Sequence, residues 1–80
     1  METMLGEIEL FPFTFIPRGW LLCNGQILNI TQYQALYSLL GFSYGGDGRT
    51  TFALPNLLGT EPVPNTKYCI AVEGLYPQRN

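Results

Sequence analysis

Few side chains in this sequence could perform acid–base or metal chemistry. The 80-residue chain has no histidine, which removes the commonest general base and most zinc sites. Glu7 and Glu9 would share one face of an extended strand, opposite Ile8 and Leu10, and this is the expected solvent face. We therefore interpret the two carboxylates as solvated charges, and we predict no catalytic residue, cofactor or metal site.

The segment YGGDGRTTF at 44–52 is the second place where chemistry could reside. It lacks the Gly-Lys-Ser/Thr ending of a nucleotide-binding loop and the spaced acids of a calcium loop. One interpretation is structural, with glycines turning the backbone and Asp47 accepting hydrogen bonds from local N–H groups. The other is an exposed recognition loop in which Tyr44, Asp47 and Arg49 contact a ligand such as a cell-surface glycan.

Aromatic residues offer a third candidate. Phe11, Phe13 and Phe15 would lie on one face of an extended segment, and Pro12 restricts that segment to the edge of a sheet. Exposed apolar patches mark interfaces, so the three rings are candidates for a subunit contact, with a small local core as the alternative. Trp20 could be a sugar-stacking platform or a core residue, and its apolar neighbours favour the core.

Composition points toward association. Charged residues make up 12% of the chain, against roughly 25% in typical soluble domains. A domain this small buries only about 60% of the surface that its unfolded chain exposes. We therefore expect the chain to cover apolar surface by forming homo-oligomers.

Charge and hydropathy exclude other partners. Four scattered bases against six acids form no basic stripe, so nucleic-acid binding is not expected. No apolar run approaches the roughly 20 residues that span a bilayer, so membrane insertion is not expected. The N-terminal METMLGEIE lacks the features of a secretory signal, which predicts synthesis in the cytoplasm without a signal peptide.

The elements that would position these residues are mostly short strands. Alternation predicts a half-buried strand over 5–10, and Asn24-Gly25 predicts a hairpin between strands at 20–23 and 26–30. A glycine-rich loop over 42–51 precedes a short strand at 51–54, and a proline-rich connection over 55–66 follows it. An unbroken apolar run predicts a last strand at 67–72, buried on both faces.

A single helix is predicted from Thr31 to Gly41, about three turns long. Thr31 and Gln34 have the spacing of a capping box, with Ile30 and Ala35 as the accompanying staple. Gly41 ends the helix where a left-handed residue is favoured. The apolar stripe of this helix consists of Tyr33, Leu36, Tyr37 and Leu40.

These elements predict one α+β domain over residues 1–80, rich in strands and with one amphipathic helix. Cys23 and Cys69 lie far apart in sequence, each within an apolar run. Both are interpreted as small buried hydrophobic residues, and a disulfide remains open if their strands meet.

Several segments in order resemble the phage tail collar domain, especially its small microcystin-dependent-protein-like members. They are GEIELF at 6–11, PRGWLLCNGQ at 17–26, ALYSLLG at 35–41, YGGDGRTTFALPNL at 44–57 and CIAVEGLYPQRN at 69–80. The resemblance implies a small tail-collar-like fold and a structural, non-enzymatic role in the virion tail or a tail-like particle. It also implies a trimer that contacts other tail or baseplate proteins.

The sequence departs from the family pattern in two places. Leu58 and Thr60 stand where the family usually has arginines, so no role of those arginines carries over. A long Gly-, Thr- and His-rich segment usually precedes the final strand, and here residues 55–67 connect directly to it. The resemblance thus implies a collar without a receptor-binding tip, which favours an adaptor.

Overall fold

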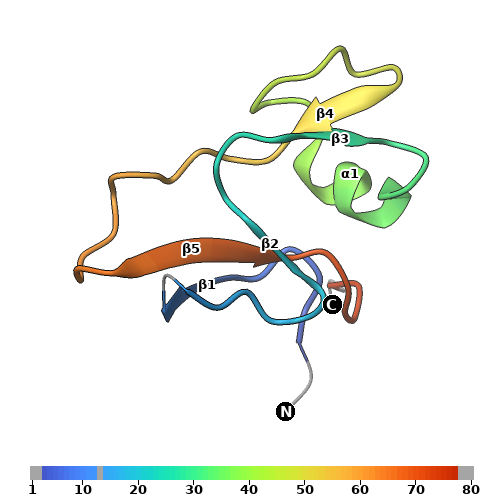
Figure 1. Ribbon diagram of the computed structural model, residues 1–80. Coiled ribbons are helices and arrows are strands. Elements are labelled where there is room, and N and C mark those ends of the chain that lie inside the picture. Colours follow the sequence, from blue (N-terminus) through green and yellow to red (C-terminus); the bar gives the residue numbers. More distant parts are fainter. Residues whose placement is uncertain (1–2, 13, 78–80) are drawn as a thin grey trace.

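The computed structural model of the chain describes residues 3–12 and 14–77. Within these residues the chain forms two small antiparallel sheets and one short helix (Figure 1). In chain order the elements are β1 (Ile8–Pro12), β2 (Trp20–Leu22), β3 (Ile27–Asn29), α1 (Gln34–Leu40), β4 (Thr51–Ala53) and β5 (Thr66–Ala71). This strand-rich arrangement with one helix is compatible with the predicted α+β class.

The first sheet has the strand order β1-β5-β2, so the last strand lies between the first two. The apolar run of β5 explains this place, because a central strand is covered on both faces. Cys69, Ile70 and Ala71 are fully buried, which confirms the prediction for this strand. As predicted, the segment that ends with Pro12 is an edge strand, where a residue without an N–H is tolerated.

Two details of β1 differ from the prediction. The strand begins at Ile8 instead of residue 5, because Leu5 N donates to Leu75 O and Gly6 has a φ of +86°. Ile8 was expected to face the interior, yet its side chain is 41% exposed. Because β1 is an edge strand, Ile8 has β5 on one side and no strand on the other within the described residues, so part of its side chain stays exposed.

The second sheet consists of β3 and β4, and it replaces the predicted hairpin between 20–23 and 26–30. That prediction was wrong, because β2 pairs with β5 and β3 pairs with β4. Asn24 and Gly25 do form a turn: Asn24 Oδ1 accepts from Gln26 N at 3.1 Å, and Gly25 has a φ of +79°. The turn therefore leads the chain from one sheet to the other.

The helix α1 is shorter than predicted and begins without the expected capping box. Its N-cap is Tyr33, which makes no side-chain cap hydrogen bond. Gln32 N and Tyr33 N donate to carbonyls of the preceding turn, so residues 31–33 stay outside the helix. The predicted end is confirmed: Gly41 has a φ of +63°, and its N–H donates to Tyr37 O at 2.7 Å.

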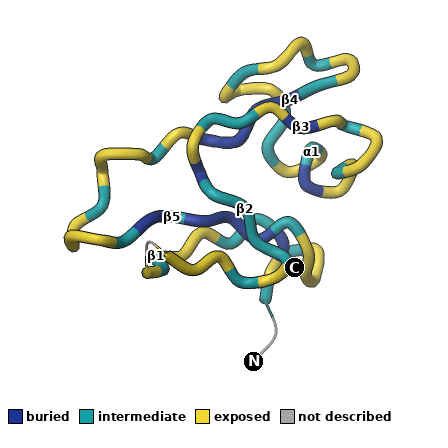
Figure 2. The backbone as a smooth tube through the Cα atoms, in the orientation of Figure 1, coloured by how far each residue is buried: buried dark blue, intermediate teal, exposed yellow. Residues whose placement is uncertain are grey.

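The core lies between one face of the first sheet and the layer of β3, β4 and α1. Figure 2 shows buried backbone in β5 and in the segment that includes β4. The predicted helix stripe packs here, with Leu36 buried and the other three residues partly buried against the core. The buried residues of this core are Leu5, Cys23, Leu28, Leu36, Phe52, Leu54 and Ile70.

The opposite face of β5 is also covered. Cys69 and Ala71 are fully buried, although they are not part of the core cluster. Residues 14–19 lead from β1 to β2, which lie on either side of β5, so this segment has to cross that strand (Figure 1). The crossing segment therefore forms a second, thin layer over the first sheet.

Both cysteines are free and buried. Leu22 is the residue opposite Cys69, so Cys23, one position further along β2, projects to the other face of the sheet. Burial raises the pKa of the Cys23 thiol to about 11, which keeps it protonated. These observations agree with the interpretation of both residues as small buried hydrophobic groups.

Candidate functional site

The loop at 42–50 is built on glycines that approach other backbone closely. Gly46 has a φ of +88°, and a Cβ atom added there would lie 2.4 Å from Phe52 Cα. Gly48 has a φ of +73°, and an added Cβ would lie 2.8 Å from the Phe42 ring. Since both positions exclude an ordinary side chain, the glycine spacing is a requirement of this loop's own fold.

Asp47 holds the loop from within. Its Oδ1 atom accepts hydrogen bonds from Arg49 N at 2.8 Å, Thr50 N at 2.9 Å and Thr51 N at 3.0 Å. Its Oδ2 atom accepts from the Thr50 hydroxyl at 3.0 Å. The backbone N–H groups of Arg49, Thr50 and Thr51 hold the pKa of this carboxyl well below its usual range. The predicted local hydrogen bonding of Asp47 is thus confirmed.

The loop also covers the outer edge of β4. Ala53 N donates to Gly45 O, and Gly48 N donates to Thr51 O, both at 3.0 Å. The Tyr37 hydroxyl donates to Gly48 O at 3.2 Å and ties the loop to α1. Three of the backbone groups of β4 that face away from β3 (Thr51 N, Thr51 O and Ala53 N) are therefore bonded within the loop.

The other two predicted ligand residues lie on the surface of this loop. The Tyr44 side chain is 55% exposed. Arg49 is also exposed, and among the described residues its guanidinium makes no hydrogen bond or ion pair. The structure thus joins Asp47 to the Arg49 backbone and leaves the Tyr44 and Arg49 side chains available. Ligand contact by the three residues stays a prediction.

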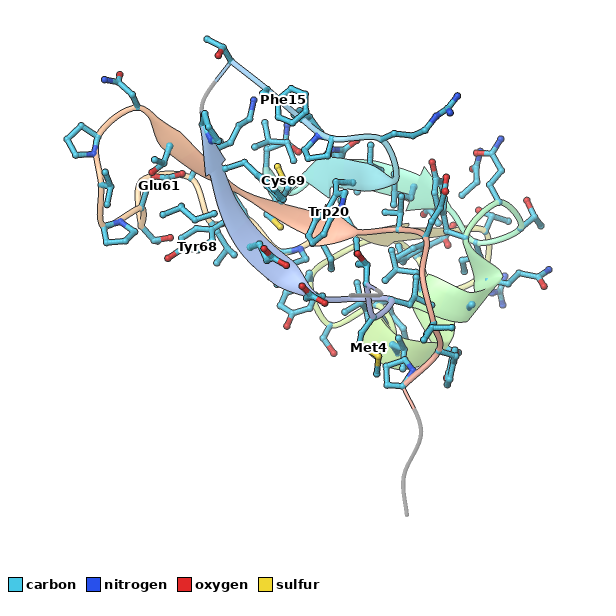
Figure 3. All side chains as sticks on the ribbon, turned by 90° about the horizontal axis from the view of Figure 1, so that it is seen from below. Met4, Phe15, Trp20, Glu61, Tyr68 and Cys69 are labelled. Atoms are coloured by element: carbon cyan, nitrogen blue, oxygen red, sulfur yellow. The ribbon has the colours of Figure 1, made fainter. Side chains whose placement is uncertain are left out.

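Of the predicted phenylalanine face, the structure describes Phe11 and Phe15, which do not lie on one extended strand. Phe11 packs edge-on against Trp20, with ring centroids 5.0 Å apart and planes at 76°. Phe15 is 58% exposed and lies on the segment that leads to β2 (Figure 3). Phe15 N donates to Pro12 O, a turn that ends the extended backbone. Phe13 lies outside the described residues, and a subunit contact through the three rings stays a prediction.

Apolar exposure extends well beyond these rings, and the sequence patterns did not indicate where. Isolated exposed apolar residues are ordinary, so the informative ones are those that gather into a contiguous patch. Of these residues, Phe15 was predicted as a subunit contact and Tyr44 as a ligand contact. The exposure of Leu39 agrees with its place outside the predicted apolar stripe of the helix. The exposed large hydrophobic residues are Met4, Ile8, Phe15, Ile16, Ile27, Leu39, Phe42, Tyr44, Leu58, Val63, Leu75 and Tyr76.

Some of these residues gather where the N-terminal segment, α1 and the C-terminal segment meet. Met4 forms a bridge with Leu75, and the Tyr76 hydroxyl lies 2.7 Å from the Ser38 hydroxyl on α1. Figure 3 shows Met4 beside the helix. Leu39 on α1 lies beside Gly6 of the N-terminal segment, so Met4, Leu39, Leu75 and Tyr76 form an exposed apolar patch from three separate segments.

Glu7 and Glu9 lie close together at β1, as their predicted common face requires. The hydrogen bond between their side chains lowers the pKa of Glu7 and raises the pKa of Glu9. Both are solvated, and within residues 3–12 and 14–77 no three acids or cysteines gather as a metal site would need. The pair therefore has the character of surface charge.

None of the helices in the described part of the chain has the length and apolar character needed to cross a membrane. The glycine loop, the two strand edges and the exposed apolar surface are thus the features that bear on function. A family model for the phage tail collar domain matches residues 6–62, which include every element from β1 to β4.

The chain belongs to the phage tail collar domain family. This family consists of structural domains of phage tail fibres, so membership makes the chain a structural component of a phage tail. The match contains the whole glycine loop and ends before β5. No curated protein matches the chain, and no solved structure does.

Proposed function

We propose that the collar-family chain is a non-catalytic adaptor in a phage tail or tail-like contractile apparatus. It assembles as a homotrimer and joins other tail or baseplate proteins. The observation that carries this proposal is the set of large apolar side chains left exposed on a single copy, which runs along the sequence from Met4 to Tyr76. Exposed apolar surface of this extent marks sites of association.

The chemistry of the chain supports a structural role. There is no histidine, and the Glu7 and Glu9 carboxylates are exposed to water. An acid–base catalyst needs a group whose pKa is tuned by burial or by neighbours in a cleft. Among the carboxyls that the structure describes, the strongly shifted exposed one is Asp47, and its hydrogen bonds stabilise its own loop.

Light scattering after size-exclusion chromatography tests the proposal at micromolar concentration. The expected mass is about three times 9.0 kDa, the mass of one chain. A well-folded monomer at this concentration contradicts the proposal. Co-purification with sheath, tube or baseplate proteins from assembled particles tests the adaptor role separately.

The second candidate function is recognition of a glycan or surface receptor by the loop from Tyr44 to Arg49. It is favoured by the exposed Tyr44 ring and by the unpartnered Arg49 guanidinium, both on a loop whose backbone is fixed by Asp47. An aromatic ring beside a bidentate donor suits sugars and carboxylates.

A glycan array separates this candidate from the adaptor. Binding that is lost with Arg49→Ala and with Tyr44→Ala supports recognition, whereas Asp47→Ala is expected to act indirectly by loosening the loop. Arg18→Ala is the matched control, because Arg18 is an exposed arginine outside the loop. Absence of binding, or binding equal in all variants, contradicts recognition.

A further inference from the structure

The two sheets have outer edges that differ in how their backbone groups are used. The edge of β4 is covered by the glycine loop. At the edge of β2, Leu22 O accepts from Asn24 N and from the Gln26 side chain, and Trp20 N donates to Pro17 O. Trp20 N and Leu22 O, two of the four outward backbone groups of these two residues, are thus used locally, which leaves less of this edge for another strand.

The outer edge of β1 is open. Ala71 N donates to Glu7 O, which fixes the alternation: Glu7 and Glu9 direct their backbone groups at β5. Ile8 and Leu10 must then direct theirs outward, and no hydrogen bond within residues 3–12 and 14–77 uses them.

The outer edge of β3 is open as well. Leu54 N donates to Gln26 O, and Ile30 N donates to Thr50 O, so the residues between, Ile27 and Asn29, direct their backbone groups away from β4. Asn29 O accepts from Gln32 N, and among the described residues the other outward groups of these two residues have no partner. Each open edge also carries an exposed isoleucine, Ile8 at 41% and Ile27 at 57%.

We propose that β1 of one copy pairs in antiparallel fashion with β3 of the next copy, an inference that rests on the proposed self-assembly. Leu10 lies opposite Ile27, and Ile8 lies opposite Asn29. The free N–H and C=O groups on both sides have the two-residue spacing that an antiparallel ladder requires. Because the two edges differ, the contact is head-to-tail, the type of contact that closes into rings such as a trimer.

Charge selects this pairing over the pairing of β1 with a second β1. In a symmetric β1–β1 ladder with Ile8 opposite Leu10, the carboxylate of Glu9 would lie directly opposite its own copy, which destabilises a strand pair. Pairing with β3 removes that repulsion. It also brings Glu7 to within two strand spacings, about 10 Å, of Arg49 beside β4 on the next copy. Because that distance exceeds the Debye length of about 8 Å at physiological salt, attraction between these two solvated charges is largely screened, and the selection depends on the missing Glu9–Glu9 repulsion.

Proline substitution tests the pairing, because it removes an outward N–H without touching the inner ladder. Ile8→Pro and Ile27→Pro are each expected to convert the oligomer to monomer at micromolar concentration, as measured by light scattering. Ile8→Val and Ile27→Val keep the N–H and the apolar surface, and they are expected to keep the oligomer. Circular dichroism and thermal unfolding establish that each variant is folded.

Cysteine cross-linking tests the same register even if a proline variant fails to fold. Residues directly opposite in an antiparallel ladder have Cα atoms about 5.5 Å apart, within the range of a disulfide. A mixture of Ile8→Cys and Asn29→Cys chains is expected to form a disulfide-linked pair under mild oxidation. Neither variant alone is expected to do so, and the buried native thiols serve as the background in wild type.

The outcomes separate this inference from the proposed function. A wild-type monomer overturns both. An oligomer that survives both proline variants and gives no cross-link in the mixture overturns only the strand pairing. A dimer that is lost with Ile27→Pro and kept with Ile8→Pro also overturns it, in favour of β3 pairing with a second β3.

Discussion

The glycine loop at 42–50 and strand β1 are both found at an outer edge of a sheet. The backbone groups at these two edges are used in opposite ways. The loop bonds most of the edge of β4 through the Gly45 carbonyl and the Gly48 N–H, and backbone N–H groups hold the carboxylate of Asp47. Strand β1 leaves its outward backbone groups open and exposes Ile8 beside them. The glycine loop, which has the most conspicuous sequence pattern, thus uses its polar groups to stabilise its own fold. Strand β1 has a less conspicuous pattern, and its outward N–H and C=O groups are available to another chain.

The largest expected effect comes from adding one methyl group to the loop. Gly46→Ala places a Cβ 2.4 Å from Phe52 Cα at a φ of +88°, so both steric overlap and backbone strain oppose it. We expect a loss of about 2–5 kcal/mol in the free energy of unfolding, measured with urea.

Gly59→Ala is the matched control for that substitution. Gly59 has a φ of +86° with nothing within 4 Å of an added Cβ, so it isolates the cost of the backbone conformation. We expect about 1–2 kcal/mol for this variant. Equal losses in the two variants would show that the loop does not depend on its close approach to β4.

The acid dependence of stability should change when Asp47 is replaced. Backbone N–H groups hold the pKa of this carboxyl below its ordinary value of 3.8, so the folded state favours the ionised form. Its contribution is therefore present above about pH 4 and is lost as the pH falls below that value.

Asp47→Asn removes the titrating group and keeps one carbonyl acceptor for the N–H donors. We expect the variant to be less stable than wild type at neutral pH, with the difference shrinking as the pH is lowered below about 4. Urea unfolding of both proteins across this pH range gives the difference in their free energies of unfolding. The contributions of the other carboxyls are common to both proteins, so they cancel in this difference. A difference that stays constant with pH would contradict the assigned role of Asp47.

Sequence-based predictions were correct where the type of a residue restricts its structural role to a single possibility. The apolar run of β5, the proline that confines β1 to an edge and the glycine that ends α1 are of this kind. Asp47 among glycines also has a local use, because short carboxylates cap nearby N–H groups. These features depend on neighbours in the sequence, so they could be predicted without the fold.

The failures depended on partners far away in the sequence. Asn24-Gly25 does form a turn, but strand β5 occupies the side of β2 where a hairpin partner would lie. Likewise, the exposure of Ile8 follows from the edge position of β1 in the sheet. Periodicity predicts which side chains share one face of a strand. Only the order of the strands in the sheet decides which of those side chains have no neighbouring strand to cover them.

The smallest expected effect on stability belongs to the exposed ring of Phe15. Since the side chain is 58% exposed, Phe15→Ser should change the free energy of unfolding of a single copy by no more than about 0.5 kcal/mol. Assembly should respond more strongly if the ring lies in a subunit contact, because aromatic residues carry much of the energy of interfaces.

Thermal unfolding in dilute solution and light scattering at micromolar concentration measure these two quantities on the same variant. Phe11→Ser is the informative comparison, because Phe11 packs on Trp20 within its own chain and its loss should destabilise the single copy. If Phe15→Ser left the oligomer intact and Phe11→Ser lowered only stability, neither ring would be a contact residue. Association would then depend on the open edges of β1 and β3 or on the patch formed by Met4, Leu39, Leu75 and Tyr76, because those surfaces remain unchanged in both variants.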